Sequence, residues 1–239
     1  MSRYASDPSS ASSAVRLAFL PSPLLGPATW APLVNMLGGR GWSTTVAPVL
    51  PGITSAADVQ EMFDSALPSG EDLVLVAHSN AGLFIPWLAD RHRVAASVFV
   101  DAALPLSPGP VALSPPDFYD FLTGMADESG LLPPWTQWWE ASEVRELIPD
   151  SQMRDALTRQ TQRLPLSYFR ETVPVPTGWH QKPCAYVAFG DTYAEEKRFA
   201  AHSGWPVRTL PGRHLHMVVD PEEVAANITE LLAVLGNSG

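Results

Sequence analysis

Short apolar runs alternate with amphipathic stretches along most of the chain. Most of the apolar runs have no polar alternation, which is typical of parallel strands covered on both faces; they lie at 15–20, 43–50, 72–77, 97–100, 184–189 and 207–210. Helical patterns lie between them, at 30–41, 55–67, 81–92, 194–204 and 220–236. This alternation predicts an α/β fold: a doubly wound, mostly parallel six-stranded sheet with helices on both faces and right-handed crossovers.

Two of the expected helices carry start signals. Ser55 stands before the second helical pattern as a capping residue. Asp220 precedes the last pattern, and Pro221 takes the first helical position, where its missing N–H is not needed.

Residues 105–183 interrupt the alternation. They contain no convincing strand, many prolines and the aromatic stretch LPPWTQWWEASEVRELI. The tryptophans of a helical insertion would close a small core of their own, or wall a pocket as a cap, and the two roles are compatible. We expect a helical cap at 105–183, an α/β core made of 15–104 and 184–239, and a disordered Ser-rich tail at 1–14. The candidates for pocket walls are Trp135, Trp138 and Trp139.

Composition narrows the class of partner. The chain has 239 residues, enough for one large domain, and 25 acidic against 15 basic residues give a net charge of −10. The absence of long basic runs argues against nucleic acid and anionic membranes as partners, and the apolar runs are too short for a membrane helix.

The single cysteine, Cys184, and the lack of a signal-peptide pattern predict a cytoplasmic protein. The expected partner is a small molecule, with the oligomeric state open.

The stretch DLVLVAHSNAGLF carries the clearest chemistry. A buried strand ends near Ala77, and a helix opens after Asn80, so that Ser79 lies on a sharp strand-to-helix turn. Such a turn needs small neighbours, which Ala77 and Ala81 provide. Ser79 is then a candidate nucleophile, with the Asn80 N–H facing a developing oxyanion. The alternative is a serine that only caps the helix.

A serine nucleophile needs a base, and LPGRHLHMVVDPEEV offers one. Here the chain resembles the α/β-hydrolase superfamily, in which the catalytic histidine often lies seven residues before the proline that opens the final helix. The resemblance implies His214 as the base, because it precedes Pro221 by seven residues. His216 is expected to pack near the pocket. No further cluster supports a metal site here, and no cofactor is implied.

The acid of the triad is ambiguous. The family's common position after the next-to-last strand falls on Tyr193, and Asp191 is two residues early. A second position known in the superfamily follows the strand after the nucleophile, where Asp101 ends the run SVFV. We favour Asp101, because a carboxylate there is costly to bury unless it is paired. Asp191 remains the alternative, and Asp101 as a mere loop cap is the simplest rival role.

The loop FLPSPLLGPATW departs from the family pattern. The family's His-Gly pair aligns with Pro21 and Ser22, so the usual second oxyanion donor falls on Pro23, which has no N–H. Either the Leu24 N–H or Ser22 Oγ would replace it, or the site does not stabilise an oxyanion. Plant hydroxynitrile lyases, which share the fold, have a threonine hydroxyl where we align Ser22.

The resemblance covers residues 15–236 and implies a strand order 2-1-3-4-5-6. It predicts a serine hydrolase that cleaves an ester or thioester with an apolar or aromatic moiety through Ser79, His214 and Asp101. The alternatives are a lyase, cyclase or acyl transferase that uses Ser22, Ser79 and His214 without a covalent intermediate, and a non-catalytic binder of small molecules.

Overall fold

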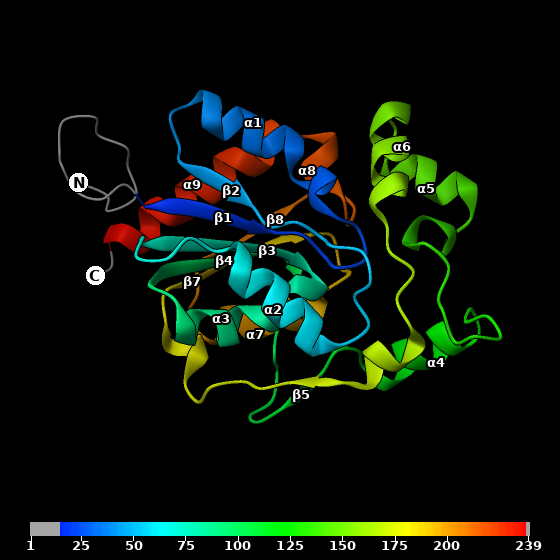
Figure 1. Cartoon of the computed structure of the whole chain (residues 1–239). Helices are drawn as coiled ribbons and strands as arrows, with labels where there is room; N and C mark the ends of the chain where they lie inside the picture. Colours follow the sequence, from blue (N-terminus) through cyan, green and yellow to red (C-terminus); the bar gives the residue numbers. More distant parts are fainter. Residues whose placement is uncertain (1–14, 238–239) are drawn as a thin grey trace.

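The computed structural model describes residues 15–237, and its centre is a six-stranded parallel sheet (Figure 1). The strand order is β2-β1-β3-β4-β7-β8, which confirms the predicted order. All five neighbouring pairs are parallel, as the uniformly apolar strands predicted. The strands are β1 (Arg16–Leu20), β2 (Thr44–Val46), β3 (Leu73–Ser79), β4 (Val94–Ala102), β7 (Cys184–Phe189) and β8 (Val207–Leu210).

Helices cover both faces of the sheet (Figure 1). One face carries α1 (Ala31–Gly39), α8 (His216–Val219) and α9 (Pro221–Asn237), and the other carries α2 (Ala56–Ala66), α3 (Ile85–Arg91) and α7 (Ala194–His202). The predicted helix starts are confirmed. Ser55 forms a capping box with Asp58, and Asp220 accepts a hydrogen bond from the Glu223 N–H. Every residue of β3 is buried, because it lies in the middle of the sheet between the two helical layers.

The segment between β4 and β7 adds no strand to the main sheet. Its helices lie beyond the carboxyl ends of the strands, and its last part, drawn in yellow, runs back below the sheet toward β7 (Figure 1). Its helices are α4 (Pro116–Thr123), α5 (Ala141–Leu147) and α6 (Ser151–Gln160), and its 3-10 turns are Trp135–Gln137, Leu166–Arg170 and Trp179–Gln181. The expectation of no strand was wrong in one detail. β5 (Val111–Ala112) and β6 (Thr172–Val173) pair antiparallel, but two residues each are too few to give a strand pattern.

Several long-range hydrogen bonds join this segment to the α/β core, and two of them reach N–H groups at the start of helical turns. Gln160 Oε1, at the end of α6, accepts from the Ala28 N–H at 2.7 Å, in the 3-10 turn Pro27–Thr29. Glu171 Oε2 accepts from the Ala56 N–H at 2.8 Å, at the start of α2. A carboxylate at a helix N-terminus is favourably placed, because the first N–H groups there lack helical partners.

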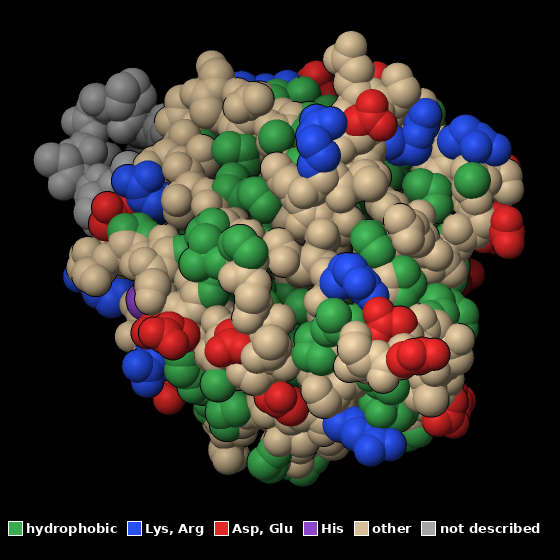
Figure 2. Space-filling view, turned by 45° about the vertical axis from the view of Figure 1, so that its right-hand side comes forward, with side chains coloured by type: hydrophobic (Ala, Val, Ile, Leu, Met, Phe, Trp, Pro, Cys, Tyr) green, Lys and Arg blue, Asp and Glu red, His purple; other side chains and the backbone are tan. Residues whose placement is uncertain are grey.

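The surface carries charged side chains of both signs. On the face in Figure 2, acidic and basic side chains are interspersed among apolar and uncharged ones. No helix within residues 15–237 is long and apolar enough to cross a membrane. The predicted disordered tail, residues 1–14, lies outside the described residues.

Candidate active site

Ser79 ends β3 in a strained backbone conformation. Its φ of 56° and ψ of −135° lie outside the regions that non-glycine residues favour. The chain enters a 3-10 turn (Asn80–Phe84) directly afterwards and continues into α3. Ala81 is fully buried, and a Cβ on Gly82 would lie 2.2 Å from the Ala103 carbonyl oxygen. The turn therefore depends on small residues after the serine, and it places Ser79, which is 7% exposed, at the carboxyl edge of the sheet.

Asp101 and His214 form a buried pair beside this turn. His214 Nδ1 lies 2.7 Å from Asp101 Oδ2, and Asp101 Oδ1 accepts from the Phe189 N–H at 2.9 Å. The Asp101 side chain is 1% exposed, so both oxygens of this buried carboxylate have partners. The Nδ1 contact leaves His214 Nε2 as the free nitrogen of the ring, and Nε2 makes no hydrogen bond to any residue in 15–237. Asp101 thus holds one ring nitrogen of His214, and within residues 15–237 no hydrogen bond joins the other to Ser79 Oγ.

The alternative acid lies elsewhere. The Asp191 side chain is 90% exposed and pairs with Lys197 at 3.3 Å. Asp101, not Asp191, is the carboxylate that contacts His214. The position of Asp101 near the end of β4 explains the difference, since β4 is the neighbour of β3 and its residue Ala102 pairs with Ser79.

Two residues of this site were not predicted from the sequence. Tyr193 Oη lies 3.3 Å from Ser79 Oγ, and its ring centroid is 5.7 Å from that of His214. Burial raises the pKa of Tyr193 well above its usual value, so the phenol is neutral at physiological pH. The signal that would have found it is its position, since it stands where the family commonly has its acid.

His78 is fully buried beside the loop that carries His214. Its Nε2 lies 2.9 Å from the His214 carbonyl oxygen, and the two rings lie 4.4 Å apart. Burial, together with the nearby His214, keeps the pKa of His78 well below its usual value. His78 is therefore neutral and donates its Nε2 hydrogen to the loop that carries His214.

The loop after β1 forms a compact turn around Ser22. The N–H groups of Leu25 and Gly26 donate to the Ser22 carbonyl oxygen, and the Leu24 N–H donates to Ser22 Oγ at 3.3 Å. Ser22 is fully buried and Leu24 is 5% exposed. Of the two groups predicted to replace the missing donor of Pro23, the Leu24 N–H therefore already donates to Ser22. The Ser22 hydroxyl accepts that bond and retains its own hydrogen for donation.

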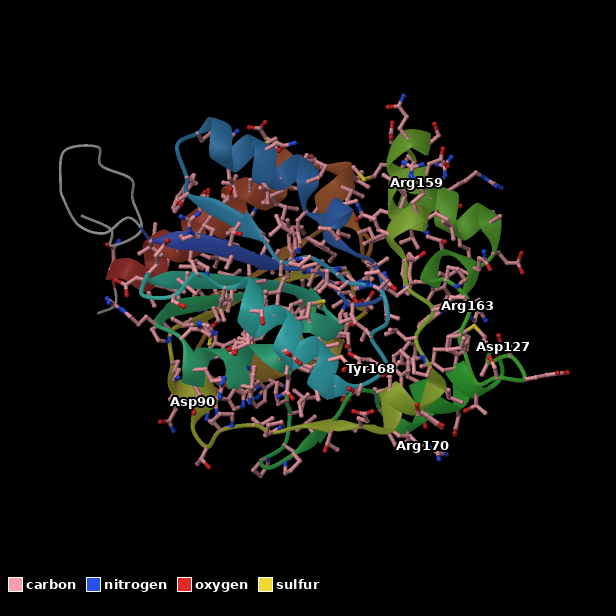
Figure 3. All side chains as sticks on the ribbon, in the orientation of Figure 1. Asp90, Asp127, Arg159, Arg163, Tyr168 and Arg170 are labelled. Atoms are coloured by element: carbon pink, nitrogen blue, oxygen red, sulfur yellow. The ribbon has the colours of Figure 1, made fainter. Side chains whose placement is uncertain are left out.

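The side chain of Asn80 is used for structure. Its Nδ2 donates to the Leu113 carbonyl oxygen at 2.9 Å, and its Oδ1 accepts from Tyr168 Oη at 2.7 Å. Figure 3 shows Tyr168 where the β4–β7 segment reaches the sheet. The backbone N–H of Asn80 is the group of this residue that remains for chemistry, at the first position of the 3-10 turn.

A pocket of about 400 Å³ opens beside His214. Its apolar walls are Trp135, Trp139, Leu147 and Phe189, and its charged lining residues are Glu143, Asp191 and Arg213. The Trp135 ring lies 6.3 Å from the His214 ring. An apolar pocket with a few polar groups beside a base is the usual form of a small-molecule site.

Trp138 does not line this pocket, contrary to our expectation. Its indole N–H donates to the Pro133 carbonyl oxygen at 2.8 Å, and its ring packs against Phe118 and Phe169. These contacts turn the ring into the interior of the β4–β7 segment. Trp138 thus packs within the β4–β7 segment, whereas Trp135 and Trp139 line the pocket.

The rim of the pocket joins the His214 loop to the β4–β7 segment. Arg213, adjacent to His214, pairs with Glu146 of α5 at 2.7 Å. Both side chains are more than half exposed, so this pair is expected to add little stability. His216 Nε2 lies 2.9 Å from Glu223 Oε2, and His216 is not among the residues that line the pocket. Among the described residues, no group of three or more His, Cys, Asp or Glu side chains is arranged to hold a metal ion.

Comparison with known proteins gives the fold its name. No family model matches the chain, and no curated protein matches it at a significant level. Solved structures match over nearly the full length. An extracellular α/β-hydrolase from a Paenibacillus species, with structural and functional homology to tobacco salicylic acid binding protein 2, has a TM-score of 0.70 and 17% identity, and the match covers 93% of this chain and 99% of that one.

Two further structures are similar. Polyneuridine aldehyde esterase has a TM-score of 0.68 and 16% identity, with 91% of this chain and 98% of that one covered. The pyrethroid hydrolase PytH has a TM-score of 0.64 and 19% identity, with 91% and 97% covered. The chain therefore has the α/β-hydrolase fold, as the resemblance of its motifs predicted.

Proposed function

We propose that this protein is a serine esterase that hydrolyses an ester or thioester with an apolar or aromatic moiety. The observation that carries the proposal is the 2.7 Å contact between Asp101 and His214, buried beside a serine at positive φ. A carboxylate, an imidazole held by it and a serine on a sharp strand-to-helix turn are the three parts of nucleophilic acyl transfer.

In the proposed mechanism, Ser79 Oγ attacks the acyl carbon while His214 Nε2 takes its proton. Asp101 remains ionised, holds the Nδ1–H tautomer and stabilises the imidazolium that forms. His214 then protonates the leaving alkoxide or thiolate. A water molecule deprotonated by the same nitrogen attacks the acyl-enzyme, and Ser79 Oγ leaves with the proton.

We assign the oxyanion to the Asn80 N–H and the Ser22 hydroxyl. Pro23 has no N–H to offer, and the Leu24 N–H already donates to Ser22 Oγ. That bond fixes the Ser22 oxygen and leaves its hydrogen available. A hydroxyl donor would supply the stabilisation that a backbone N–H gives in related enzymes, about 3 kcal/mol for each donor.

The proposed substrate class follows from the pocket. Trp135, Trp139 and Phe189 offer aromatic walls beside His214, and a volume of about 400 Å³ accommodates a ring system or a short chain. Two of the similar structures are described as an esterase for polyneuridine aldehyde and a hydrolase for pyrethroids. These descriptions support ester hydrolysis for this chain as well.

The proposal is tested by steady-state hydrolysis of paired esters. Methyl benzoate and phenyl acetate are compared with methyl acetate for the wild type and for Ser79→Ala. We expect turnover of the aromatic esters, with kcat/KM falling by about 10³-fold or more in the variant. Equal activity of the two proteins, or preference for methyl acetate, would contradict the proposal.

The lack of an N–H at Pro23 favours a second candidate. A lyase would use His214 as acid and base and the Ser22 hydroxyl on the substrate oxygen, with no covalent intermediate. Such an enzyme would process a cyanohydrin. Neither the wild type nor Ser79→Ala would then form an acyl adduct.

A further inference from the structure

The phenol of Tyr193 is in contact with the proposed nucleophile. Its Oη lies 3.3 Å from Ser79 Oγ, and this is the side-chain hydrogen bond that Ser79 makes within residues 15–237. The mechanism proposed above needs no such group. The hydrogen bond between the Tyr193 hydroxyl and Ser79 Oγ is therefore not explained by that mechanism.

The sheet order decides which side of Ser79 this phenol occupies. Tyr193 lies in the loop after β7 and His214 in the loop after β8, and both strands lie on the same side of β3. The Ser22 turn follows β1, which lies on the other side of β3. Tyr193 thus shares the side of the base, and it is not a replacement for the oxyanion donor that Pro23 lacks.

The direction of the hydrogen bond follows from the protons available. When His214 accepts the Ser79 hydrogen, Oγ has only lone pairs to offer to Tyr193. The phenol keeps its hydrogen, because burial disfavours its charged form. The bond therefore runs from Tyr193 Oη to Ser79 Oγ during catalysis.

We propose that Tyr193 is a further catalytic residue, which donates a hydrogen bond to Ser79 Oγ as this oxygen leaves the acyl-enzyme. The inference rests on the proposed function. In this step the bond between the acyl carbon and Oγ breaks, and its electron pair goes to Oγ. The proton comes from the His214 imidazolium, formed when His214 deprotonated the attacking water. Tyr193 keeps its own proton throughout.

The contribution falls mainly on deacylation. The ester oxygen of an acyl-enzyme is a weak hydrogen-bond acceptor, whereas the departing alkoxide is a strong one, so the bond strengthens on the way to the transition state. In acylation the starting hydroxyl is already a good acceptor, and the gain is smaller. Removing the phenol should therefore slow the second half-reaction more than the first.

The experiment separates the two half-reactions with two probes. A fluorophosphonate measures attack by Ser79 alone, because its phosphonyl adduct does not turn over, whereas p-nitrophenyl acetate measures both halves. The wild type is compared with Tyr193→Phe, which keeps the ring beside His214. The matched control is Tyr119→Phe, a change in α4 at a hydroxyl without a hydrogen bond in the described chain.

We expect Tyr193→Phe to label with fluorophosphonate within about threefold of the wild-type rate, while steady-state turnover of p-nitrophenyl acetate falls about tenfold or more. Intact mass during turnover should then show the acetyl-enzyme in the variant, and Tyr119→Phe should behave as the wild type. Unchanged turnover, a faster rate, or equal loss of labelling and turnover would overturn the inference. Absence of labelling in the wild type would instead overturn the proposed function.

Discussion

Asp101 is the residue on which the orientation of His214 depends. Its two oxygens bind His214 Nδ1 and the Phe189 N–H, and its φ of 42° shows that the backbone is strained to hold it there. An amide at this position would present to His214 either an N–H, which cannot accept a hydrogen bond, or a neutral oxygen. Neither stabilises an imidazolium as a carboxylate does. The residue therefore acts on the chemistry through His214.

Replacing Asp101 by Asn should lower kcat by about 10³- to 10⁴-fold, because the wrong tautomer of His214 is favoured. Asp191→Asn is the matched control and should stay within about twofold, since its carboxylate is exposed and pairs with Lys197. The measurement is kcat on the best aromatic ester, with circular dichroism to verify folding. Loss in Asp191→Asn alone would reverse the assignment of the acid.

Ser22 offers a second test at single-residue scale. Ser22→Ala removes the proposed oxyanion donor, so kcat should fall by about 10²-fold or more while KM changes little. Ser97→Ala, at another buried serine in β4, serves as the control for a lost hydroxyl in the core. Full activity in Ser22→Ala would contradict the assignment and identify the released Leu24 N–H as the donor.

Among the elements, the β4–β7 segment is joined to the turn after Ser79 through the side chain of Asn80. Asn80 bonds Leu113 near β5 and Tyr168 in the turn Leu166–Arg170, so that both ends of the segment meet at one side chain. Tyr168 and Asn80 are both buried, so that solvent does not compensate for the loss of the hydrogen bond between them. This junction fixes the start of the 3-10 turn and with it the Asn80 N–H.

Tyr168→Phe should lower the free energy of unfolding by about 1 to 3 kcal/mol, because Asn80 Oδ1 is left buried without a partner. Chemical denaturation measures the change, and Tyr119→Phe again provides the control. A loss below about 0.5 kcal/mol would contradict the importance of this junction.

The long elements were predictable and the short ones were not. The six strands are recognisable because burial on both faces requires apolar residues at every position, and β7 and β8 begin and end as predicted. β5 and β6 consist of two residues each, and their pairing depends on contacts more than fifty residues apart along the chain. No local pattern encodes such a pair.

The same contrast applies to the site. Ser79 and His214 occupy motifs with fixed local spacing, and Asp101 is marked by a charge at the end of an apolar strand. Tyr193 stands at the family's usual acid position, but a tyrosine there gives no sign of its contact with Ser79 until the fold is known. Whether Trp138 or Trp139 faces the pocket depended on the 3-10 turn at Trp135–Gln137, which periodicity does not reveal.

At the scale of the whole molecule, His78 couples the site to stability. It is fully buried and neutral, and it ties β3 to the loop between β8 and α8 through the His214 carbonyl. Its pKa lies well below the usual value in the folded state, whereas in the unfolded chain it is near 6.5. The unfolded state therefore binds a proton below about pH 6.5 that the folded state does not bind.

Stability should consequently fall as the pH drops below about 6.5, with His78 contributing up to about 1.4 kcal/mol per pH unit. Urea midpoints at pH 7.5 and 5.5 measure this for the wild type and for His78→Gln, which keeps an N–H donor without a titrating ring. The difference between the two pH values should be smaller in the variant. An equal difference in both proteins would show that His78 does not carry the effect.

The central claim is that Ser79 is an activated nucleophile, and intact mass spectrometry after incubation with a fluorophosphonate tests it most directly. The account predicts a single adduct on the wild type and none on Ser79→Ala, with His214→Ala reacting at least about a hundredfold more slowly. A folded wild-type protein that forms no adduct, or an adduct that persists in Ser79→Ala, would contradict it.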